Sequence, residues 1–133
     1  FPRGEETRPG DIIALDLDSQ KERYVKATRA SRRVVGVHSD EFATLIGGKT
    51  PTDGSDLLAA NEKDFIPVSL AGRVRTWVIG PVHTGDLIIP STTPGVGCAP
   101  QACTSPVQTQ VVGYAVEGDD RTDLRRIRIR IGG

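Results

Sequence analysis

Two stretches of this chain, Gly10-Asp11-Ile12-Ile13 and Gly85-Asp86-Leu87-Ile88, share a Gly-Asp pair followed by apolar residues. Each opens a segment that leads to a Val-Val-Gly sequence, at 34–36 in the first and at 111–113 in the second, after nearly the same spacing. A repeated unit that is too small to bury its own core has to pack against its copy. We therefore predict an all-β fold, a single duplicated barrel-like domain over 1–133 with repeats at about 9–79 and 84–131.

The Gly-Asp pairs have a structural role in this interpretation. Gly10 and Gly85 allow the backbone angles needed where a strand begins, and Asp11 and Asp86 can accept backbone N–H groups in the turn. The alternative is two unrelated tight turns.

Turn-forming residues recur at intervals of about eight to twelve residues, which is typical of barrels and sandwiches. The 15 Gly and nine Pro argue against long helices. Ser55 is a suitable N-cap for at most one short helix over 56–61, and 47–64 is otherwise one long loop. The apolar runs predict strands over 11–16, 24–28, 33–37, 66–70, 72–79, 86–89, 110–116 and 124–131.

Alternation along these strands places one apolar face on the core and fixes the register, because a slip of one residue would bury the polar face. The expected core is Ile12, Leu15, Val25, Val35, Val37, Val68, Leu70, Val74, Val78, Leu87, Ile89, Val112, Ala115, Ile127 and Ile129.

The charge balance limits the classes of partner. The 133 residues include 17 Lys plus Arg and 17 Asp plus Glu, and a neutral chain of this kind is not expected to be a dedicated nucleic-acid binder. It has no apolar run of about 18 residues, so we expect no membrane span. The sequence begins at Phe1 and contains no Met, so we expect a fragment, a proteolytic product or a domain of a longer chain.

Cys98 and Cys103 lie five residues apart in a stretch rich in Gly, Pro, Ser and Thr. Neither has a His or a second Cys pair nearby, so we expect no zinc site, and no other metal or cofactor is expected. The sequence leaves open whether the two residues form a local disulfide or remain free thiols.

Candidate catalytic residues are few. His38, Ser39 and Asp40 bring a base, a nucleophile and an acid together, but in a strand Ser39 points away from the other two, so catalysis would need a turn here. The alternative is a polar strand end. Glu5 and Glu6 could act as general acid or base, or could belong to a solvated N-terminal arm.

Two strands carry alternating cationic side chains, and each alternation places these side chains on one face. Such a face could bind a phosphate, an acidic glycan or the carboxylates of a partner. The alternatives are a solvated sheet face, charged protection of an edge strand, or salt bridges between subunits. The cationic residues are Arg73 and Arg75 in one strand, where the neutral Trp77 continues the same stripe, and Arg126, Arg128 and Arg130 in the other.

An ordered series of motifs then resembles a known family. The segments are 1–4 (Phe-Pro-Arg-Gly), 9–16, 33–39, 67–74, 85–91 and 94–95. The sequence resembles the peptidase G2 family, the autoproteolytic intramolecular-chaperone domain at the C-terminus of bacteriophage tail spikes and neck appendages. The resemblance covers the chain from Phe1 to about Val116.

This resemblance implies a module that follows a trimeric, β-rich fibre, assists its assembly and then cuts itself free. In the family, the cut lies just upstream of an Asp-Tyr-Ala-Glu type motif whose acidic residues are thought to promote cleavage. This chain begins at Phe1 and does not contain the motif, so no catalytic residue is carried over. The implied location is the virion or the extracellular space, and the implied partner is the chain itself, as a trimer.

Three functions remain open at this point. The first is the assembly module just described. The second is a structural or adhesion module of an extracellular filament or fibre, without catalysis. The third is a barrel that binds a small anionic ligand or a glycan, although an aromatic content of only 5% offers few stacking platforms for a sugar.

Overall fold

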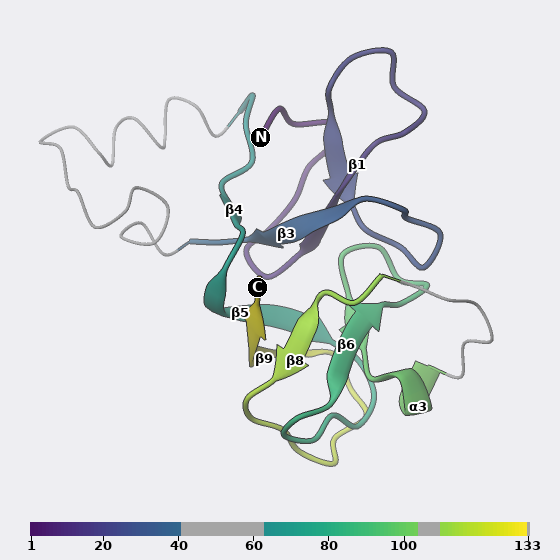
Figure 1. Ribbon diagram of the computed structural model, residues 1–133, viewed down its shortest axis with the longest axis vertical. Helices are drawn as coiled ribbons and strands as arrows, with labels where there is room; N and C mark the ends of the chain where they lie inside the picture. Colours follow the sequence, from purple (N-terminus) through teal and green to yellow (C-terminus); the bar gives the residue numbers. More distant parts are fainter. Residues whose placement is uncertain (41–62, 104–109, 133) are drawn as a thin grey trace, which may run out of the picture.

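The computed structural model describes residues 1–40, 63–103 and 110–132, and its fold is all-β, as predicted from the sequence. Figure 1 shows an antiparallel sheet in the upper half of the view and a barrel in the lower half. The sheet has the order β2-β1-β3-β4 and the closed barrel the order β5-β7-β6-β8-β9.

The element bounds follow the predicted strands closely. The sheet consists of β1 (Ile12–Leu15), β2 (Tyr24–Lys26), β3 (Val34–His38) and β4 (Val68–Ser69). The barrel consists of β5 (Gly72–Val78), β6 (Leu87–Pro90), β7 (Gly97–Cys98), β8 (Gly113–Ala115) and β9 (Arg125–Ile131). One short helix, α3 (Pro100–Cys103), follows β7.

The sequence did not predict β7 or α3. Strand β7 has two residues, one of them Gly97, and is too short to show any alternation. Helix α3 begins at Pro100, a residue favoured in the first turn of a helix, but four residues give no helical period to read. The predicted helix over 56–61 and residues 47–62 of the predicted long loop lie outside the described residues.

Strand order is the same in the two halves of the chain. In the sheet, β1 lies between β2 and β3, and β3 pairs with β4; in the barrel, β6 lies between β7 and β8, and β8 pairs with β9. The registers also correspond, because Ile13 is opposite Gly36 and Ile88 is opposite Gly113.

Both Gly-Asp turns contain the same side-chain bond. The carboxylate of Asp11 accepts the N–H of Arg8 at 2.8 Å, and that of Asp86 accepts the N–H of His83 at 2.9 Å. An aspartate that accepts a backbone N–H within its own turn fixes the direction of the strand that follows.

Each turn is also hydrogen-bonded to the strand that pairs with the one it precedes: the first turn to β3, which pairs with β1, and the second to β8, which pairs with β6. The N–H of Gly10 donates to the carbonyl of His38, and the N–H of Gly85 donates to the carbonyl of Ala115, each at 2.8 Å. Both glycines have positive φ, 99° and 92° respectively, a conformation that favours glycine over other residues.

Strand β1 is buried on both faces because its successive side chains enter different cores. Ile12 packs among the residues that fill the barrel and its rim, whereas Ile13 packs with Tyr24, Ile66 and Val68 on the other face of the sheet. Phe1 packs against this second cluster, with its ring edge-on to Tyr24 at 4.8 Å between centroids. The sheet is therefore enclosed between the barrel and the N-terminal segment.

Most of the expected core is buried, but two residues were assigned wrongly. Leu70 and Leu87 are exposed. Leu70 lies between β4 and β5, where the chain leaves the sheet, and Leu87 points out of the barrel while Ile88 points in. The run Leu-Ile-Ile offers no polar residue to mark its outward side, so Leu87 was wrongly assigned to the core, whereas Ile89 is buried as expected.

Candidate functional site

The cationic side chains of β5 and β9 lie on one face of the barrel. These two strands form a continuous antiparallel ladder, and the residues between the cationic positions are buried inside. The ladder therefore places like charges directly across from each other. The pairs on the outer face are Arg73 with Arg130, Arg75 with Arg128, and Trp77 with Arg126.

One end of this face is closed by the N-terminal arm. The indole N–H of Trp77 donates to the carbonyl of Pro9 at 2.9 Å, and the guanidinium of Arg8 lies 4.1 Å from the centre of the indole ring. Arg126 lies 5.9 Å from the same ring and 4.0 Å from the carboxylate of Asp40. Trp77 thus holds the arm against the barrel through its hydrogen bond to Pro9 and its cation–π contact with Arg8, while Arg126 pairs with Asp40, which follows the end of β3.

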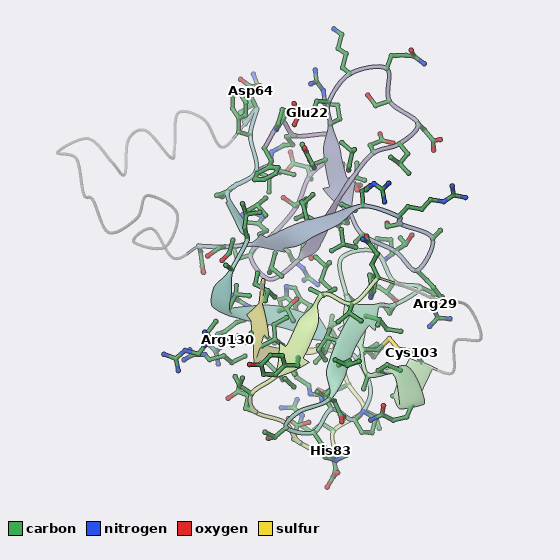
Figure 2. The ribbon with its side chains drawn as sticks, in the orientation of Figure 1. Glu22, Arg29, Asp64, His83, Cys103 and Arg130 are labelled. Carbon is green, nitrogen blue, oxygen red and sulfur yellow. A yellow bond between two sulfur atoms is a disulfide. The ribbon has the colours of Figure 1, made fainter. Side chains whose placement is uncertain are left out.

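The other end is open. We call the side chains of Arg73, Arg75, Arg128 and Arg130 the arginine face; Figure 2 labels Arg130 on the outside of the barrel. Among the residues that the structure describes, none of these four guanidinium groups has an ion pair or a hydrogen bond. Like charges directly opposite each other in a sheet repel. This face therefore concentrates positive charge. The carboxylate of Glu117 lies beside it but accepts the backbone N–H of Arg128 at 2.7 Å, not a guanidinium N–H.

His38, one of the predicted catalytic residues, is buried at the end of β3. Its Nδ1 lies 2.9 Å from the hydroxyl of Thr7, and that hydroxyl accepts a hydrogen bond from Arg3 at 2.9 Å. Burial, assisted by the charges of Arg3 and Arg126 and opposed by that of Asp40, lowers the pKa of His38 to about 4. The imidazole is therefore neutral at pH 7, with Nδ1 free to accept the proton of the Thr7 hydroxyl.

The neighbours of His38 are engaged elsewhere. Ser39 is buried and its N–H donates to the carbonyl of Pro67, while Asp40 is exposed and lies near Arg126. The sequence did not indicate Thr7 or Arg3 as partners of His38, because the contacts cross from the N-terminal arm to β3 and leave no local pattern.

Glu5 and Glu6 belong to the same arm. The carboxylate of Glu5 accepts the N–H of Lys26 at 2.8 Å, which attaches the arm to β2. Glu6 lines a pocket of about 300 Å³ together with Lys26 and the buried Asp11. Burial raises the pKa of Asp11, against the opposing effect of the hydrogen bond and charge of Arg8.

The two Gly-Asp turns differ in their surroundings. Asp11 is covered by the N-terminal arm, whereas Asp86 remains partly open and accepts a hydrogen bond from Gln101 at 2.9 Å. Beside the second turn, His83 lies 2.6 Å from Asp120, and this hydrogen bond raises the pKa of His83. No local sequence pattern marks this exposed His–Asp pair, because the two residues lie 37 positions apart in the chain.

Cys98 and Cys103 form a disulfide, with their Cα atoms 6.0 Å apart. The bond joins β7 to the end of α3, and Figure 2 shows it beside that helix. The guanidinium of Arg29 donates to the carbonyl of Cys103, which connects this region to the loop after β2.

Comparison with known proteins gives no assignment: no protein-family model matches the sequence, and no curated protein matches it. Within 1–40, 63–103 and 110–132, no group of three or more His, Cys, Asp and Glu side chains is arranged to hold a metal ion. No helix in the same part of the chain has the length and apolar character needed to cross a membrane.

Proposed function

We propose that this chain is the assembly module of a phage tail-spike-like or fibre protein, and that it acts as an intramolecular chaperone by associating with further copies of itself. The observation that carries the proposal is an apolar groove between the sheet and the barrel that no segment within 1–40, 63–103 or 110–132 covers. The sequence resemblance to a family of trimeric fibre modules supports the same function. In this proposal the protein belongs to the virion or the extracellular space, and the Cys98–Cys103 disulfide suits such an oxidising environment.

The groove has a volume of about 400 Å³ and is lined by β3 on one side and by β6, β8 and the end of β9, with Arg130, on the other. Its walls include Leu70, Leu87, Val111 and Tyr114, whose exposed fractions are 53%, 49%, 50% and 43%. Exposed apolar patches of this kind, bordered by polar residues, mark interaction sites.

In the first repeat, the surface that corresponds to the groove is buried. Leu87 and Tyr114 are cross-strand partners in β6 and β8, and the corresponding partners after the first Gly-Asp turn are Ile12 and Val37. Ile12 and Val37 are completely buried against the barrel, whereas Leu87 and Tyr114 have no covering element among the described residues. A second copy of the chain, which carries the same kinds of surface, is therefore the occupant that we propose for the groove.

The test is the oligomeric state. We expect light scattering after size exclusion to give the mass of an oligomer, a trimer according to the resemblance, at micromolar and higher concentrations. Leu70→Lys and Leu87→Lys place a charge in the groove and should shift the protein to monomer. Leu17→Lys is the matched control, because Leu17 is 55% exposed but does not line the groove.

A wild-type protein that stays monomeric over this range would contradict the proposal, as would a control variant that dissociates as readily as the groove variants. Circular dichroism of each variant checks that the fold is retained.

Self-cleavage belongs to the same proposal and has a separate test. It is followed by intact mass and N-terminal sequencing of the full product of the native gene. A discrete product that disappears when acidic residues upstream of Phe1 are replaced supports cleavage. If the protein remains uncleaved through assembly, the result favours the non-catalytic structural or adhesion module instead.

A further inference from the structure

We propose that the arginine face binds an acidic polypeptide segment in extended conformation, through its carboxylates. This interaction differs from self-association, because Arg73, Arg75 and Arg128 lie outside the groove and only Arg130 also lines it. The partner is thus a protein chain with carboxylates on alternate residues.

The spacing of the arginines favours an extended chain. Arg73 and Arg75 are two residues apart in β5, and Arg128 and Arg130 are two apart in β9. Residues two apart in a strand repeat at about 6.6–6.8 Å, and directly opposite residues have Cβ atoms about 5 Å apart. An extended polypeptide repeats its side chains at the same interval, so consecutive carboxylates on one of its faces meet consecutive arginines.

The positive charge of the arginine face is not balanced by ion pairs within the described residues. The four guanidinium groups have no ion pair or hydrogen bond among the described residues, although Arg8, Arg121, Arg125 and Arg126 each have a carboxylate partner there. Two like-charge pairs across a ladder destabilise the sheet unless anions lie between them. The chain is neutral overall, so this positive charge is a local feature of β5 and β9.

All four positions are arginine, and the planar guanidinium can bind a carboxylate through two parallel hydrogen bonds. The nearest aromatic residue on the same two strands, Trp77, is half-buried, donates to Pro9 and has Arg8 over its ring. Its ring is therefore not available to stack on a base or a sugar. Tyr114 in β8 lies opposite Arg130 and is 43% exposed, but a single ring at one end of the face offers no succession of stacking platforms for bases or sugars. Carboxylates of a polypeptide therefore fit the face better than either.

The experiment measures binding of a fluorescein-labelled peptide of alternating Glu and Thr residues by fluorescence anisotropy at low and physiological salt. Heparin and a single-stranded oligothymidylate are the comparison probes. We expect the peptide to bind the wild-type protein and Arg75→Gln/Arg128→Gln to weaken that binding about tenfold or more, because charge-assisted hydrogen bonds are lost.

Two further variants make the result specific. Arg32→Gln/Arg33→Gln removes the same charge from an exposed loop after β2 and should change the affinity by less than about twofold, a minor effect on the binding free energy. Arg75→Lys/Arg128→Lys keeps the charge without the planar group and should give an intermediate affinity.

The proposal is overturned if the peptide does not bind, if the loop variant weakens binding as much as the variant in the arginine face, or if heparin or the oligonucleotide binds more tightly than the peptide. Oligomeric state is recorded for every variant. A protein that remains oligomeric but fails to bind the peptide refutes only this inference, and a monomer that binds it refutes only the proposed self-association.

Discussion

His38 shows how a residue with catalytic chemistry can be given a structural role. Its imidazole is buried, and its Nδ1 is held by Thr7, which is itself held by Arg3. This arrangement joins the N-terminal arm to the end of β3. The low pKa of His38 follows first from its burial and then from the charge of Arg3 in the arm.

We predict that replacing His38 by Gln removes a pH dependence from the stability of the fold. The folded pKa is about 4 and the ordinary value is 6.5, so on acidification the unfolded chain takes up the proton first. The stabilising contribution of the neutral imidazole is complete above the unfolded pKa and is lost as the pH falls towards the folded pKa, by about 1.4 kcal/mol per pH unit.

Urea unfolding of the wild type and His38→Gln at about pH 7 and about pH 5 measures this difference, and the wild type should lose about 2 kcal/mol more than the variant between these values. The raised pKa of Asp11 acts in the opposite direction, but it is common to both proteins and cancels in the comparison. Equal losses in the two proteins would show that the imidazole does not have the surroundings described here.

The two turn glycines give a matched pair of substitutions. Gly10 and Gly85 have similar positive φ, but a Cβ on Gly10 would lie 2.8 Å from the ring of Trp77, whereas a Cβ on Gly85 meets nothing within 4 Å. We expect Gly85→Ala to cost about 1–2 kcal/mol of backbone strain, and Gly10→Ala to cost at least about 1 kcal/mol more because the indole and the arm have to move. Chemical denaturation measures both, and equal costs would contradict the close packing of Gly10 against Trp77.

At the scale of elements, the ladder between β5 and β9 places arginines opposite each other, and we expect a substitution that removes one of these like charges to reduce their repulsion. Arg73→Glu places a carboxylate opposite Arg130, and we expect it to raise the free energy of unfolding by about 0.5 kcal/mol, with a smaller gain for Arg73→Gln. Thermal denaturation at low and high salt measures the gain, which should shrink as salt screens the charges. A loss of stability, or a gain that does not depend on salt, would mean that the two guanidinium groups do not repel each other across the ladder.

The same ladder shows how far the sequence could describe the candidate site. Alternation in each strand was sufficient to infer that Arg73 and Arg75 share a face, as do Arg128 and Arg130, because side chains point to opposite faces in turn. The opposition of the two arginine pairs depends on which strands are neighbours, and β5 and β9 are separated by most of the second repeat.

At the scale of the whole molecule, the N-terminal arm joins the sheet to the barrel. The carbonyl of Gly10 accepts hydrogen bonds from the N–H of Trp77 and the hydroxyl of Thr76, while the N–H of Gly10 donates to His38 in the sheet. Ile12 extends the same connection by packing into the core that fills the barrel. The two parts should therefore unfold together.

Trp77, the single tryptophan of the chain, lies where the arm crosses the barrel and reports on this connection. We expect denaturation followed by Trp77 fluorescence to coincide with denaturation followed by far-ultraviolet circular dichroism, as for one cooperative unit. Two separated transitions would mean that the sheet and the barrel are independent.

The sequence by itself determined the all-β class and the approximate position of eight strands, because these follow from the local alternation of apolar and polar residues and from turn-forming glycines and prolines. Only the tertiary structure decided how the strands combine into a sheet and a closed barrel, why Ile12 is buried while Leu87 is exposed, and how the arm reaches Trp77 from 68 residues away in the chain. The physical reason is the sequence distance over which the two kinds of interaction act. Strand formation depends on neighbours in the sequence, whereas burial, ion pairing and cation–π contacts depend on which distant segments come to lie side by side.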